Sequence, residues 1–305
     1  MARLFVLILT LVLFTCSEST DPSTENISFQ VQPVQVDAKY GASEQAHYIV
    51  RNNVTHINKL LLFIGGSFSV PKNYELICQS AASIGLDVIS LSYPNSVATA
   101  PLGTSSDRFI FDNYRDELCF GNSVSDEVSV DVFNCITTRA TKLVLYLKNL
   151  YPEQNWGQYI TSSNTLQWDK IILSGHSQGS GHACYIGKKI LVNRVLMFSG
   201  PNDYSTYYGT AANWLTVSGH TPLTRHFSLL HVKDEIVPFN NQVANLKGLG
   251  LLSPDQNPIV VDDLMPPYFG SHSLSLSISA LSFHSSTIGG NSRLPNVWTY
   301  MLTTE

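Results

Sequence analysis

The chain has 305 residues, of which 44% are hydrophobic, and a formal net charge of -5. This length is sufficient for one large domain with a core of ordinary size. Because the chain has no polybasic segment, the sequence predicts no nucleic-acid partner and no attraction to anionic membranes. A small polar or neutral partner fits this charge better.

The first 19 residues have the layout of a secretory signal. Arg3 precedes an apolar run from Leu4 to Phe14, and small residues follow it. That run is too short for a bilayer span. We therefore expect residues 1–19 to be a signal peptide, residues 20–305 to form a single domain, and the mature chain to be secreted without stable membrane insertion.

The mature chain alternates between two kinds of segment. Residues 30–51 alternate in polarity, which indicates an antiparallel pair of strands, and short apolar runs then alternate with helical patterns. Runs that are almost continuously apolar are typical of parallel strands buried on both faces. The pattern predicts an α/β fold, a mostly parallel central sheet with helices on both faces. We expect strands at 59–66, 86–93, 169–175, 193–200 and 225–232, and helices at 72–85, 127–150, 180–191 and 241–250.

Secretion affects how asparagines and cysteines are interpreted. Asn26 and Asn53 lie in Asn-x-Ser/Thr sequons and are predicted glycosylation sites. Cysteines tend to pair in an oxidising compartment, and Cys119 and Cys135 flank a polar stretch, so a disulfide between them is predicted. No two cysteines have the close spacing of a zinc site, and we expect neither a metal nor another cofactor.

The segment "GHSQG", Gly175 to Gly179, lies where a predicted strand meets a predicted helix. It fits G-x-S-x-G, in which the serine occupies a strained turn and the glycines remove side chains that would collide. The helix N-terminus beside Ser177 favours the anion formed during acyl transfer. Ser177 is therefore the predicted nucleophile, and the alternative is that the glycines serve close packing alone.

A serine nucleophile needs a base, and the base needs an acid that orients it. Where the serine lies in a G-x-S-x-G turn of this kind, the three residues occur along the chain in the order serine, acid, histidine. Asp234 comes just after the predicted strand 225–232 and is the first candidate for the acid. Asp203, which follows the preceding predicted strand, is the alternative.

Two histidines after Asp234 are candidates for the base. "SHSLSLSISALSF" alternates with period two, which predicts a strand with His272 near its beginning and His284 just past its end. In a parallel sheet the chemistry lies outside the carboxyl ends of the strands, which favours His284. The alternative takes 258–264 as the last strand and His272 as the base.

Two backbone N–H groups are needed to stabilise the oxyanion. Gln178, directly after the nucleophile, is predicted to supply one. The other is expected from Ser67 or Phe68 in "FIGGSFS", because the two glycines allow the backbone to approach a substrate closely.

With these residues the chain resembles the α/β-hydrolase superfamily of serine hydrolases, and within it a group of secreted single-domain members with a GHSQG elbow followed by Gly-His-Ala. The resemblance covers roughly residues 45 to 303 and includes "LLLFIGG", "VISLSYPN", "GHSQGSGHA", "HVKDEIVP" and "LPNVWTYML". It implies Ser177 as nucleophile, Asp234 as acid and His284 as base.

The expected function is cleavage of a small-molecule or lipid-like ester through an acyl-enzyme, as in a carboxylesterase. Peptide, thioester and polyester substrates stay open, as does the oligomeric state. The aromatic residues Tyr204, Tyr207, Tyr208 and Trp214 either cover the pocket or pack locally. The alternative to an enzyme is a catalytically inactive hydrolase fold that acts as a secreted binding or adhesion module.

Overall fold

The computed structural model describes residues 26–41 and 44–305. The predicted signal peptide, residues 1–19, lies outside this part of the chain. Within the described residues, no helix is both long enough and apolar enough to cross a membrane.

A nine-stranded sheet forms the centre of the molecule, in the order β1-β2-β4-β3-β5-β6-β9-β11-β10. Strand β2 pairs antiparallel with β1 and with β4, and all other neighbours in this sheet are parallel. The predicted α/β class with a mostly parallel central sheet is confirmed. The strands are β1 (Asn26–Val31), β2 (His47–Asn52), β3 (Leu60–Ile64), β4 (Asp87–Leu91), β5 (Ile171–His176), β6 (Arg194–Phe198), β9 (His226–His231), β10 (Ile259–Val260) and β11 (Ser273–Leu276), with β7 (Tyr204–Ser205) and β8 (Thr210–Ala211) in a separate ribbon.

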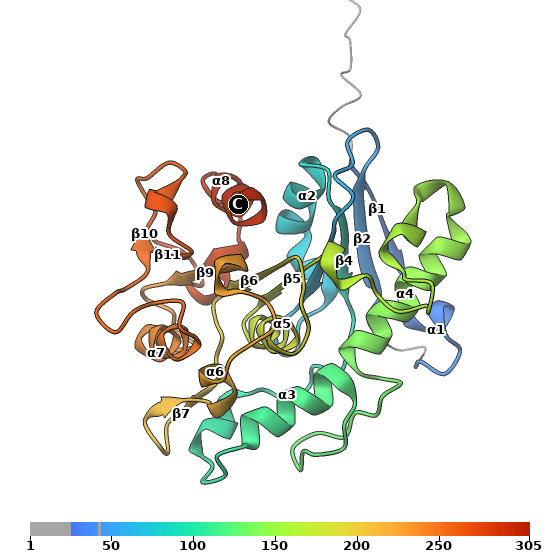
Figure 1. Ribbon diagram of the computed structural model, residues 1–305. Helices are drawn as coiled ribbons and strands as arrows, with labels where there is room; N and C mark the ends of the chain where they lie inside the picture. Colours follow the sequence, from blue (N-terminus) through green and yellow to red (C-terminus); the bar gives the residue numbers. More distant parts are fainter. Residues whose placement is uncertain (1–25, 42–43) are drawn as a thin grey trace, which may run out of the picture.

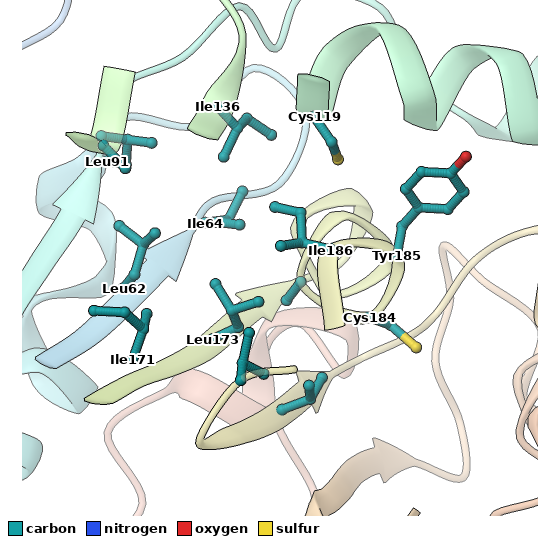
Figure 2. Packing of buried hydrophobic residues seen from close by; sticks show 14 of the residues in the cluster. Leu62, Ile64, Leu91, Cys119, Ile136, Ile171, Leu173, Cys184, Tyr185 and Ile186 are labelled. Atoms are coloured by element: carbon teal, nitrogen blue, oxygen red, sulfur yellow. The ribbon is translucent and has the colours of Figure 1, made fainter. Parts of the chain in front are cut away.

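Helices cover both faces of the sheet (Figure 1). Successive side chains of a strand point to opposite faces, so Leu62 packs in one hydrophobic cluster and Phe63 in another. Figure 2 shows the first cluster, where Leu62 and Ile64 of β3 lie near Ile186 of α5. The second cluster contains residues of α2 (Glu75–Ser83) and α8 (Leu294–Thr303). The first contains residues of α3 (Ile110–Phe120), α4 (Ile136–Leu150), α5 (Gln178–Lys189), α6 (Asn213–Thr216) and α7 (Phe239–Leu249), with α1 (Pro33–Val36) beside it.

The five predicted buried strands are all present, each one to three residues shorter than its apolar run. The helix expected at 127–150 begins only at Ile136, and α3 was not predicted. Strand β11 ends at Leu276, although the alternating pattern continues to Phe283. Its last pair with β9 joins Leu276 to His231, and β9 itself ends at His231.

The predicted disulfide between Cys119 and Cys135 is not present, and both cysteines are buried free thiols. Their sulfur atoms have different neighbours: Cys119 Sγ lies 3.5 Å from Nδ1 of His182, whereas Cys135 Sγ lies 3.3 Å from the carbonyl oxygen of Val132. The polar stretch between Cys119 and Cys135 is held by hydrogen bonds. The carboxylate of Glu117 accepts backbone N–H bonds from three of its residues, Val124, Ser125 and Val130.

The two sequons differ in their surroundings. Nδ2 of Asn26, the atom that a glycan would modify, donates to the side chain of Ser83 and to two oxygens of Gln79. A glycan there would have to replace these bonds. Asn53 is exposed and follows the end of β2, so of the two predicted sites it is the more accessible.

Candidate active site

Ser177 lies in the sharp turn between β5 and α5. Its backbone has φ 56° and ψ −124°, a conformation that is uncommon for a residue with a side chain and is found at functional sites. A Cβ atom at Gly175 would lie 2.1 Å from the carbonyl oxygen of Gly179, and one at Gly179 would lie 2.0 Å from that of Ile64. Both glycines are therefore required by the close approach of the turn to its neighbours.

Asp234 and His284 are hydrogen-bonded to each other. Nδ1 of His284 lies 2.8 Å from one carboxylate oxygen of Asp234 and 3.0 Å from the other. The same carboxylate accepts bonds from the backbone N–H groups of Ile236 and Val237 and from the amide of Gln242. Burial alone would raise the pKa of Asp234. The hydrogen bond and the electrostatic interaction with His284, together with the two backbone bonds, outweigh burial and lower this pKa. Asp234 is thus an ionised acceptor that fixes the imidazole.

The backbone of His284 is held on both sides. Its N–H donates to the carboxylate of Glu235 at 3.0 Å, and its carbonyl accepts from Nε2 of His176 at 3.0 Å and from the hydroxyl of Ser199 at 2.6 Å. Burial, reinforced by the neighbouring His284, lowers the pKa of His176 to about 3, so this ring is neutral. Because a carbonyl only accepts, Nε2 of His176 carries the proton.

The alternative acid and base lie elsewhere. Asp203 is completely buried and accepts bonds from the guanidinium of Arg115, at 2.5 and 2.9 Å, and from the indole of Trp214 at 2.8 Å. His272 stacks on Phe227 with ring centroids 4.1 Å apart. Neither residue lines the cleft that contains Ser177.

The two oxyanion donors predicted after β3 are not equivalent. The N–H of Phe68 donates to the carbonyl of Asn95 at 3.0 Å and is not available to an oxyanion. Within residues 26–41 and 44–305, the N–H groups of Ser67 and Gln178 donate to no other group. Their side chains are joined, because the Ser67 hydroxyl donates to Oε1 of Gln178 at 2.5 Å. This bond ties the loop after β3 to the turn after β5.

A cleft of about 670 Å³ opens over these groups, which is within the usual range for small-molecule sites. Ser67, Ser177 and His284 line it, and Nδ2 of Asn202 lies 3.3 Å from Oγ of Ser177. None of the lining residues that the structure describes is Asp, Glu, Lys or Arg. In the same part of the chain, no group of three or more His, Cys, Asp or Glu residues is arranged to hold a metal ion.

The aromatic segment after β6 contributes less to the cleft than its composition suggests. Tyr204 lines the cleft, but Tyr207 and Tyr208 pack against each other with ring centroids 4.8 Å apart. Trp214 is buried and packs on Tyr185, 5.3 Å between centroids. Three of the four residues therefore pack locally.

Sequence reasoning missed Arg115, whose guanidinium hydrogen-bonds to the turn that contains Ser177. In addition to its bonds with Asp203, it donates from Nη1 to the carbonyl of Gln178 at 2.7 Å. A Cβ atom at Gly181 would lie 2.3 Å from Nη2 of Arg115. Gly181, the second glycine of α5, was the available signal that a large side chain lies against this turn of the helix.

Together, the strand order, the antiparallel pairing of β2 with both β1 and β4 and the parallel pairing of all other neighbours define an α/β fold with a mostly parallel central sheet. No protein-family model matches the chain, and no curated protein matches it. Among solved structures, the chain is similar to TT1662 from Thermus thermophilus, with 13% sequence identity over 91% of this chain and 97% of that chain, and a TM-score of 0.45.

Proposed function

We propose that the protein is a serine hydrolase that cleaves an ester through Ser177, His284 and Asp234, with an acyl-enzyme intermediate. The observation that carries this proposal is the strained Ser177, which lines the same cleft as an imidazole fixed by a buried carboxylate. Strain at a single hydroxyl-bearing residue, beside a base and its orienting acid, is the arrangement that nucleophilic catalysis requires.

In the first half of the reaction, Oγ of Ser177 attacks the ester carbonyl and passes its proton to Nε2 of His284. The oxyanion of the tetrahedral intermediate accepts bonds from the N–H groups of Ser67 and Gln178. The carbonyl then re-forms, the bond to the alcohol breaks, and His284 returns the proton to the leaving alcohol. Asp234 holds the imidazole in the right tautomer and stabilises its protonated form throughout.

In the second half, water attacks the acyl-enzyme and gives its proton to His284. The same two N–H groups stabilise the second oxyanion, and collapse releases the carboxylic acid while Ser177 regains its proton. No group from outside the chain is needed for either half, other than the ester and water.

The proposal includes secretion. Its support is the sequence pattern of residues 1–19, and glycosylation at the exposed Asn53 is proposed with it. Peptide mapping of protein secreted from a eukaryotic host would test both, because it identifies the mature N-terminus and any glycan at Asn53. A retained leader in the secreted protein would contradict the first, and an unmodified Asn53 the second.

The purified protein is expected to react with a fluorophosphonate, which phosphonylates an activated serine and releases fluoride. Labelling should approach one probe per chain and should not occur after heat denaturation. The loss of activity toward an activated ester should be proportional to the fraction of chains labelled. A chain that neither labels nor hydrolyses a panel of activated esters would instead support the inactive binding module.

His284→Ala is expected to lower kcat for an activated ester by about 10⁴-fold or more, because the members of a triad act as a unit. The matched control is His272→Ala, which removes a histidine of the same segment that lies outside the cleft. It should keep turnover near that of the wild type. A dead His272 variant beside an active His284 variant would show that the base is misassigned.

A further inference from the structure

Two large apolar side chains that line the cleft are mostly exposed in the part of the chain that the structure describes. Phe68 is 71% exposed and Ile236 is 60% exposed, and both line the cleft that contains Ser177. Phe68 follows β3 and Ile236 follows β9, strands that lie on either side of β5 and β6 in the sheet. The two side chains therefore approach the nucleophile from different sides.

The loop that presents Phe68 is strained and firmly held. Phe68 has φ 60°, a left-handed conformation that is an outlier for a bulky residue. Its N–H donates to the carbonyl of Asn95, and the amide of Asn95 donates in turn to the carbonyls of Gly66 and Ser69, each at 2.9 Å. Such strain persists only where surrounding bonds impose it, and it marks functional positions. Here these bonds hold the backbone of Phe68 in place next to Ser67, the second proposed oxyanion donor.

The charge of the cleft restricts what can bind there. No cationic side chain lines it to pair with a carboxylate, and Asp234 lies directly behind His284. Glu235, the residue after Asp234, is exposed, and its carboxylate accepts bonds from the hydroxyl of Ser282 and the N–H of His284. A charged acyl group would lose part of its hydration without gaining a partner of opposite charge.

We propose that Phe68 and Ile236 are the walls that bind an apolar, uncharged acyl chain, so that the substrate class is an ester of a medium-length aliphatic acid. The proposal rests on the proposed function, because it assigns the acyl side of the same cleft. An acyl carbon bonded to Ser177, with its oxygen at the N–H of Ser67, has Phe68 as the next residue along the loop. A hydrocarbon chain that leaves this carbon gains favourable free energy when it covers the ring and Ile236.

The test compares kcat/KM for p-nitrophenyl acetate, butyrate and hexanoate. With each methylene partly removed from water, kcat/KM is expected to rise about twofold per methylene, and so about tenfold or more from acetate to hexanoate. The p-nitrophenyl half-ester of adipic acid, in which a carboxylate replaces the terminal methyl group of the hexanoyl chain, should react at least about tenfold more slowly than hexanoate.

In Phe68→Ala the ratio of hexanoate to acetate should fall by about fivefold or more, and in Ile236→Ala by a smaller factor. The matched control is Phe109→Ala, which removes another exposed phenylalanine, 55% exposed and outside the cleft, and should leave the ratio unchanged. Because Phe68 is exposed, its truncation opens no core cavity. Circular dichroism and the rate of fluorophosphonate labelling verify that the variant is folded.

The outcomes separate this inference from the proposed function. If the wild type labels and hydrolyses esters but shows no preference for hexanoate, or if Phe68→Ala keeps the wild-type ratio, the acyl-wall inference is overturned while the hydrolase stands. If the wild type neither labels nor hydrolyses any ester, both fall.

Discussion

Ser177→Ala is expected to lower kcat by about 10⁵-fold or more and to abolish labelling by a fluorophosphonate. The variant retains the N–H groups of Ser67 and Gln178 and the His284–Asp234 pair, but it has no atom that can form the acyl-enzyme. Among the residues that the structure describes, Oγ of Ser177 accepts one side-chain bond, the 3.3 Å contact from Asn202. The substitution should therefore leave the folded structure and the affinity for ester largely unchanged.

The measurement is single-turnover and steady-state hydrolysis of an activated ester, together with probe labelling. Ser123→Ala is the matched control, since Ser123 is an exposed serine that does not line the cleft. It should behave as the wild type. Equal labelling of Ser177→Ala and the wild type would end the serine-hydrolase proposal.

The features of the candidate site whose position in the fold could be predicted from the sequence are encoded locally. The turn at Ser177 requires glycines on both sides because Gly175 and Gly179 touch backbone atoms, and this requirement is visible as a short motif. The buried strands are also visible in the sequence, because burial on both faces requires an almost continuous apolar run. Asp234 was placed at the end of β9 by the end of such a run, and it lies there.

Other features depend on partners far away along the chain. The N–H of Phe68 is occupied by Asn95, which only the folded loop reveals, so the sequence left Ser67 and Phe68 equivalent. The end of β11 depends on how far β9 extends beside it, and the alternating pattern beyond Leu276 carries no information about that neighbour. The cysteine count and predicted secretion suggested a disulfide, but they do not indicate that Cys119 faces His182.

The buried ion pair of Arg115 and Asp203 is the clearest case. Its members are 88 residues apart, and α3, which carries Arg115, lies in a segment whose sequence resembles a long loop. Asp203 was therefore a plausible catalytic acid until its partner was known. The pair instead connects α3 to the loop after β6 and, through the carbonyl of Gln178, to the first turn of α5.

Arg115→Met is expected to destabilise the protein by about 3–5 kcal/mol, because it leaves the carboxylate of Asp203 buried without its counter-charge. Burial alone would lower the pKa of Arg115, but the adjacent Asp203 outweighs burial and raises it, so the guanidinium is charged throughout the accessible pH range. Removing it also leaves the carbonyl of Gln178 without its 2.7 Å donor. Urea unfolding at neutral pH, followed by circular dichroism and fluorescence to check for a two-state transition, measures the change.

The double variant Arg115→Met with Asp203→Asn separates the cost of an unpaired charge from that of lost packing. Replacing both charges of a buried pair costs much less than removing one, so the double variant should be more stable than Arg115→Met alone. Arg293→Met is the matched control: Arg293 pairs with Asp263 at 3.4 Å, but both are exposed, and solvent screening leaves such pairs little effect on stability. If Arg115→Met unfolds at the same urea concentration as Arg293→Met, the buried pair does not brace the nucleophile turn, and the glycine at position 181 needs another explanation.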